Sequence, residues 1–236
     1  MKSKITRWGF KKDLISLLLK DVQAFNQYRQ ENNYESIDLK GAKLRGVKLD
    51  GADLAYADLT KANLDGSDLT GANLTKANLT KACLDGSALT GAILTGANFD
   101  RAYLNGAGFL RSDLSYANLN GSNLNSAVLS YANLTGSSLL RSSLLRASLC
   151  GADLTGANFD GADLSRADLS GANLAGANFD GAHLFRTDFS YANHRLTGAN
   201  FDGANFDGTD LAQADLKGAI FEKPSLLDRY IRAKGI

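Results

Sequence analysis

One apolar position recurs every five residues along most of the chain. Leu or Phe occupies it in every one of 37 units, from Leu39 to Phe189 and again from Leu196 to Phe221. An α-helix turns about 100° per residue, so a five-residue step would spread these side chains around the helix. In a strand, an odd step would send them alternately to opposite faces. The pattern therefore predicts a chain that turns about once every five residues around a shared interior.

The residues around each apolar centre support this interpretation. Ala stands two positions before the centre in 26 units, where locally extended chain would point it to the same side as the centre. Gly stands two positions after the centre in 21 units, although the whole protein has only 24 glycines. Glycine adopts positive φ without steric cost, as the third residue of a type II turn requires. Asp, Asn, Thr and Ser fill the outward positions, where their side chains can bond to turn backbone.

These units resemble those of pentapeptide-repeat proteins. The segment ADLTG at 152–156 is a representative unit of the form A(D/N)LXX, and the resemblance covers residues 37–223. It implies an all-β fold, a right-handed quadrilateral β-helix with four units per coil and no internal channel. At that rate the repeats make about nine coils.

Residues 1–36 precede the repeats and are expected to form a helical cap. Their apolar residues mark one helical stripe, which consists of Leu14, Leu18, Val22, Phe25 and Tyr28. Lys20 and Asp21 interrupt the apolar run, which is too short for a membrane span, so no membrane insertion is expected. A membrane-surface helix is the alternative, supported by Trp8, Phe10 and the flanking lysines. The segment at 25–29 is also similar to a lead-in of many bacterial, especially cyanobacterial, family members.

Residues 224–236 are expected to form a second helical cap. Pro224 ends the ladder, and Ser225 and Asp228 are suited to an N-cap pair. An open β-helix end exposes unpaired backbone that would stack on another molecule, and a helix at each end blocks that contact. A monomer is therefore favoured. C-terminal dimerisation, as in some family members, is the alternative.

The charge of the repeats is close to balanced. The net charge of the chain is +1, and residues 37–223 hold 16 basic and 20 acidic side chains. This distribution includes no polybasic tail, so direct nucleic-acid binding is not expected. Cys83 and Cys150 fall on different faces of the predicted coil and show no metal-ligand spacing, which favours a reducing cytoplasm. No cofactor or metal site is predicted.

One column of outward residues invites an enzymatic reading. If a coil has 20 residues, Ser143, Asp163 and His183 stack in one column. A serine nucleophile needs the histidine beside it and the acid behind, whereas here the acid lies in the middle. No catalytic residue is therefore predicted, and three ordinary outward residues are the favoured interpretation.

A second column is the candidate protein-interaction surface. Arg146, Arg166 and Arg186 occupy the usual glycine position on three successive coils and are flanked by Leu145 and Phe185. Leu140 is a further apolar residue at an outward site. Arginine and aromatic residues on a rigid surface suit a protein interface, whereas chance drift of surface positions is the competing explanation. A looser cationic column, which we interpret as a solvated face, consists of Lys61, Lys81, Arg101 and Arg141, with Gly121 as a gap.

An insertion interrupts the repeat frame late in the chain. The spacing between Phe189 and Leu196 is seven instead of five, so two extra residues must bulge from the rod. The bulge falls within residues 191–195, and Asn193, His194 and Arg195 form a candidate functional loop, although a tolerated insertion is the simpler interpretation. We expect no extra face to result.

Two functions fit these features. The first is a non-enzymatic protein–protein interaction module, a rigid rod that presents a side-chain pattern to an unknown protein partner and has a possible regulatory role. The resemblance allows it, because one cyanobacterial relative restrains heterocyst differentiation by engaging regulatory proteins. The alternative is a DNA mimic that protects gyrase or a related topoisomerase, as in the quinolone-resistance branch of the family. That branch resembles a strongly acidic dimeric rod, which the near-neutral repeats fit poorly.

Overall fold

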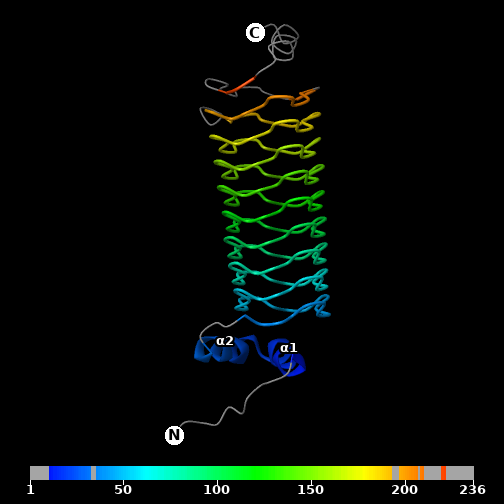
Figure 1. Ribbon diagram of the computed structural model, residues 1–236, viewed down its shortest axis with the longest axis vertical. Coiled ribbons are helices and arrows are strands. Elements are labelled where there is room, and N and C mark those ends of the chain that lie inside the picture. The colour runs from blue at the N-terminus through cyan, green and yellow to red at the C-terminus, as the bar shows by residue number, and fades with distance from the viewer. Residues whose placement is uncertain (1–10, 33–35, 193–196, 207, 210–218, 222–236) are drawn as a thin grey trace.

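The protein forms a rod with two helices at its N-terminal end (Figure 1). The computed structural model describes residues 11–32, 36–192, 197–206, 208–209 and 219–221. Within the rod, each pass of the chain lies directly above the previous pass, so the molecule grows along one axis. The C-terminal helix expected at 224–236 and the aromatic residues Trp8 and Phe10 lie outside the described residues.

The coils stack with a fixed register of 20 residues. Parallel β-bridges pair Asp53 with Asn73 and Asn73 with Ile93, and the same step relates the other sides of the rod. Across the insertion the step becomes 22, as in the bridge between Asn178 and Asn200, and it returns to 20 between Asn200 and Ile220. The insertion therefore adds residues to one coil without shifting the faces, as expected.

Each coil turns four corners through the same hydrogen-bonded turn. At a representative corner, the Ala42 N–H donates to the Leu39 carbonyl at 3.0 Å, and Gly41 between them has φ of 61°. Only one residue per side is left to pair with the coils above and below. In the described residues the ladder consequently consists of isolated bridges, without multi-residue strands.

The interior is filled by the apolar centres. Every centre from Leu39 to Phe189 has an exposed fraction of 0%. Near the C-terminal end, phenylalanines stack along the axis: the ring centres of Phe159 and Phe179 lie 4.9 Å apart, and those of Phe179 and Phe201 lie 5.1 Å apart. The predicted inward register of the centres is thus confirmed.

The N-terminal segment differs from the single helical stripe expected from the sequence. It forms two helices, α1 (Lys11–Lys20) and α2 (Val22–Glu31), separated at Asp21. Asp21 is extended, with φ of −156°, and its side chain accepts a hydrogen bond from the Ala24 N–H at 3.0 Å. An aspartate in this position competes well as an N-cap, so it begins a new helix where apolar spacing alone predicted continuity.

Helix α2 bonds directly to the first coil. The Asn26 side chain donates to the Gly51 carbonyl at 2.9 Å and accepts from the Asp53 N–H at 2.8 Å. The buried Arg29 guanidinium donates to the Ala55 carbonyl, and Phe25 packs into the same apolar core as the repeat centres. Three residues of the 25–29 lead-in therefore contact backbone and core that would otherwise face water at the end of the rod.

Candidate interaction surface

The three arginines predicted to stack do so along one corner of the rod. We call Arg146, Arg166 and Arg186 the arginine column. Each lies three residues after a member of the bridged series Ser143, Asp163 and His183, which places the arginines on successive coils. All three are exposed, and their φ angles are 59°, 61° and 55°.

The carboxylates nearest the arginine column in sequence are engaged with local backbone. Asp163 accepts a hydrogen bond from the Ser165 N–H, Asp168 from the Ser170 N–H and Asp188 from the Ser190 N–H. In the part of the chain that the structure describes, none of the three arginines lies within ion-pair distance of a carboxylate. The column therefore presents positive charge to solvent without an internal counter-charge in direct contact.

Apolar side chains accompany only part of this surface. The Arg186 guanidinium carbon lies 5.1 Å from the ring centre of Phe185, a cation–π arrangement, and Phe185 is 37% exposed. Leu145 is half-buried beside Arg146. Leu140 is not brought into this group, because it lies one side of the rod earlier, where it precedes Arg141 and lines the groove beside the looser cationic column.

The turn position occupied by these arginines is costly for residues other than glycine. Fourteen non-glycine residues in the described chain have positive φ, and all of them stand at this position. They are Tyr56, Lys61, Lys76, Lys81, Arg101, Arg111, Tyr116, Ser126, Tyr131, Arg141, Arg146, Arg166, Arg186 and Tyr191. A left-handed conformation costs an L-residue roughly 1–2 kcal/mol. All but Ser126 are long cations or tyrosines, a selection that the sequence pattern contained but that only the φ angles make meaningful.

Packing accounts for some of the tyrosines. A Cβ added to Gly151 would lie 2.6 Å from Cε1 of Tyr131, and one added to Gly136 would lie 2.8 Å from Cε1 of Tyr116. Each ring thus covers the glycine of the next coil, and this contact offers a structural reason for the tyrosine. Arg186 makes a similar contact, because a Cβ added to Gly208 would lie 3.1 Å from its Cγ. Arg146 and Arg166 cover no glycine, since the next residue along their corner is another arginine.

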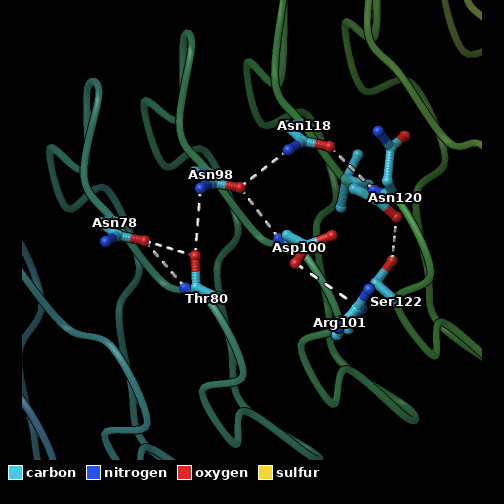
Figure 2. Close-up of polar contacts among 9 residues, drawn as sticks. Asn78, Thr80, Asn98, Asp100, Arg101, Asn118, Asn120 and Ser122 are labelled. Carbon is cyan, nitrogen blue, oxygen red and sulfur yellow. Dashed lines mark hydrogen bonds and ion pairs between the residues drawn. The ribbon is translucent and has the colours of Figure 1, made fainter.

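The looser cationic column borders a groove. Arg101 and Arg141 lie on either side of Gly121, and the space of ≈ 460 Å³ between them is lined by Leu140, Asn120 and two aspartates. Arg101 Nε lies 3.9 Å from Asp100 Oδ2, and the neighbouring side of the rod carries an asparagine ladder in which Asn118 donates to Asn98 at 3.0 Å (Figure 2). The groove is therefore built on a polar side that is held rigidly by bonds between coils.

The serine, aspartate and histidine column is assembled in the order expected from the sequence. Ser143 bridges Asp163, and Asp163 bridges His183. The Ser143 hydroxyl donates to Asn125 Oδ1 at 2.6 Å, so its proton points away from the other two residues. Nothing in this geometry prepares the serine for nucleophilic attack.

Among the described residues, no group of three or more His, Cys, Asp or Glu residues could hold a metal ion, and no helix has the length and apolar character needed to cross a membrane. Burial, followed by the charges of Asp65 and Asp85, raises the pKa of the Cys83 thiol, which makes it less reactive. The candidate loop at Asn193, His194 and Arg195 lies outside the described residues.

Comparison with known proteins identifies the repeat. The family model for pentapeptide repeats matches in eight copies, which together span residues 36–193 and 195–223. Proteins of this family fold as right-handed quadrilateral β-helices, so this part of the expected fold class is confirmed, while the number of coils and the two helical caps stay predictions. A search of curated proteins found no match.

Several solved structures are similar to this chain. HetL, a pentapeptide repeat protein involved in heterocyst differentiation regulation from the cyanobacterium Nostoc, is 32% identical, with 86% of this chain and 98% of HetL covered and a TM-score of 0.30. QnrB1, a plasmid-mediated fluoroquinolone resistance protein, is 17% identical, with 85% and 96% covered and a TM-score of 0.51. A thylakoid-lumen protein from Arabidopsis thaliana is 37% identical, with 39% and 63% covered and a TM-score of 0.38.

Proposed function

This chain belongs to the pentapeptide repeat family, and from that premise we propose that it acts as a non-enzymatic protein–protein interaction module. In this proposal the rod holds a fixed pattern of side chains against a protein partner. The arginine column, with Leu145 and Phe185, is the contact surface. HetL is involved in regulating differentiation, and a regulatory role for this chain is consistent with that relationship.

The observation that carries the proposal is the cost of the arginine column. Three successive coils place arginine in a left-handed turn where glycine would be free of strain, and the described chain offers these arginines no ion pair. Like charges on neighbouring coils also repel each other across about 4.8 Å of ladder spacing. Side chains that add strain and repulsion to the fold are best explained by a contact outside it.

Capped ends would support an interaction module, because they prevent one rod from stacking end to end on another. We propose that α1 and α2 cap a rod of about nine coils, since Asn26 and Arg29 bond to carbonyls of the first coil. A helical cap at 224–236 and a monomeric rod are proposed with it. The alternative at that end is dimerisation through the same segment. A cytoplasmic location stays a prediction.

The experiment that tests the proposal is affinity capture from the native host with the full chain. Replacement of all three column arginines by glycine is expected to abolish capture of the partner, as read by mass spectrometry. The matched control replaces Arg101 and Arg141 by glycine, which removes cations in the same kind of turn on another corner. If the triple variant captures the same proteins as the unaltered chain, the interface lies elsewhere.

A DNA mimic that protects gyrase is the second candidate. The structural similarity to QnrB1 favours it. The distribution of charge opposes it, because the repeats carry 16 basic against 20 acidic residues, whereas imitation of duplex DNA needs dense negative charge. We expect no rescue of gyrase supercoiling from a quinolone. Dose-dependent rescue at micromolar protein would instead favour the mimic.

A further inference from the structure

We propose that the partner element bound by the arginine column is an amphipathic α-helix that carries a narrow acidic stripe and lies parallel to the rod. This inference rests on the proposed function and names the partner's chemistry and shape. It follows from the spacing of the arginines, from the width of the cationic surface and from the residues that border it.

The spacing of the column matches successive turns of a helix. Arg146, Arg166 and Arg186 lie one coil apart, which corresponds to about 4.8 Å along the axis. Acidic residues at i, i+3 or i+4, and i+7 of a helix face one direction and are separated by about 5.4 Å. The mismatch over the column is about 1 Å, which arginine side chains absorb easily. Alternate residues of a strand lie about 6.7 Å apart, so the mismatch would reach about 4 Å.

The cationic surface is only one residue wide. Asp163 lies on the side of the rod before the column, and Asp168 and Asp188 lie on the side after it. A broad polyanion such as duplex DNA, with one charge per about 1.7 Å of axis, would face these carboxylates as well as the arginines. A helix with a single acidic row, bordered by uncharged residues, would contact the arginines and avoid the aspartates.

The residues that border the arginine column indicate which residues should flank the acidic row of the partner helix. Leu145 and Phe185 stand directly before Arg146 and Arg186 in the chain, and the Phe185 ring is already stacked against the Arg186 guanidinium. An apolar residue beside the acidic row would pack on this ring. Further down the same corner, the positions equivalent to Leu145 and Phe185 are occupied by Asp65 and Asp85, which would repel an acidic helix and limit it to the upper coils.

The test measures binding of synthetic helical probes to the full-length protein by fluorescence anisotropy. The first probe carries three glutamates on one face with leucine and phenylalanine beside them, and the second has the same composition with the glutamates distributed around the helix. The first is expected to bind at least about tenfold more tightly, a difference that charge-assisted pairs with arginine readily supply. A 20-base-pair DNA duplex serves as the broad polyanion and is expected to bind more weakly than the first probe.

Variants of the protein locate the binding. Replacement of the three column arginines by glycine is expected to reduce affinity for the striped probe to that of the distributed probe. Arg166→Gly alone is expected to give an intermediate loss, and the Arg101→Gly, Arg141→Gly control a loss of less than about threefold. Glycine occupies the same turn at Gly86 and Gly106 with φ of 64°, so these variants are expected to fold.

Three results would overturn the inference. These are equal binding of the two helical probes, tighter binding of the duplex through the column, or an equal loss in the Arg101 and Arg141 control. If neither helical probe binds while partner capture still depends on the column, the proposal of a helical partner is wrong, but the proposed interaction module is retained. If capture also survives loss of the column, this surface fails as the interface in both proposals.

Discussion

The same corner of the rod carries glycine in its lower coils, serine at Ser126, and arginine in the next three coils. Gly66, Gly86 and Gly106 have φ angles of 62° to 64°, and the arginines of the column have φ angles of 55° to 61°. The backbone conformation is therefore set by the coil and not by the residue at the turn. Glycine meets this requirement at lower cost, so what arginine adds at this corner is its side chain.

The interior shows no comparable variation. Every centre from Leu39 to Phe189 is a fully buried Leu or Phe, whichever coil it belongs to. A polar side chain at one of these centres would be enclosed by close-packed neighbours and could not contact water. Interior positions thus determine the fold, whereas corner positions are available for recognition.

The largest expected effect comes from breaking the interior. Leu94→Asp would bury an unpaired charge at a site with 0% exposure, at a cost of several kcal/mol, and is expected to abolish the cooperative fold. Circular dichroism and thermal melting measure this. Leu110→Asp is the control, because Leu110 is 36% exposed and points outward, and its cost is expected to be within about 0.5 kcal/mol. An unchanged melting point for Leu94→Asp would refute the inward register.

A smaller loss of stability is expected when a glycine at a turn is replaced by alanine. Gly86→Ala places a side chain in a left-handed turn with open space around it and is expected to cost about 1 kcal/mol. Gly151→Ala adds a contact of 2.6 Å with the exposed Tyr131 ring, which must shift, so its cost is expected to be larger by about 0.5 kcal/mol. Chemical denaturation measures both. Adding Tyr131→Ala should remove the excess, and persistence of the excess would show that the ring is not its cause.

Returning the arginine column to glycine is expected to change stability still less. Relief of backbone strain and of repulsion favours the glycine variant, while the greater freedom of glycine in the unfolded chain opposes it. We expect the free energy of unfolding of the triple variant to stay constant or to rise by less than about 1 kcal/mol in total. Thermal melting of the triple variant tests this. A clear fall in melting temperature would mean that the arginines support the fold.

The smallest effect concerns acid stability. Burial by itself would raise the pKa of the Asp113 carboxyl, but hydrogen bonds from the Thr95 hydroxyl at 2.7 Å and the Ser115 N–H at 3.0 Å outweigh burial, and the pKa is lowered. A carboxyl with a lowered folded pKa stabilises the protein above its unfolded value of about 3.9, and that contribution disappears as pH falls through the folded pKa. Asp113→Asn is therefore expected to lose less melting temperature between pH 7 and pH 3 than the unaltered chain. An equal loss in both would contradict the assignment.

The five-residue period by itself determined a chain that turns once per unit, the inward centres and the left-handed turn, whereas the four-sided coil, and with it the stacking of residues 20 apart into columns, was implied by the resemblance to pentapeptide-repeat proteins. Ser143, Asp163 and His183 are stacked as the 20-residue step predicted, because a regular solenoid converts a fixed sequence separation into contact between neighbouring coils. The register even continues across the insertion, since two residues are too few to form another side.

Contacts between a side chain and a residue distant in the sequence could be determined only from the tertiary structure. Tyr131 lies over Gly151, Asn26 and Arg29 bond to carbonyls of the first coil, and Leu140 belongs to the groove beside Gly121 instead of the arginine column. The period fixes where each Cα lies but not the direction of a long side chain, which depends on its rotamer and on the space left by neighbouring coils. The break at Asp21 was also visible only in the structure, because a local cap competes with helix continuity and the apolar spacing does not decide between them.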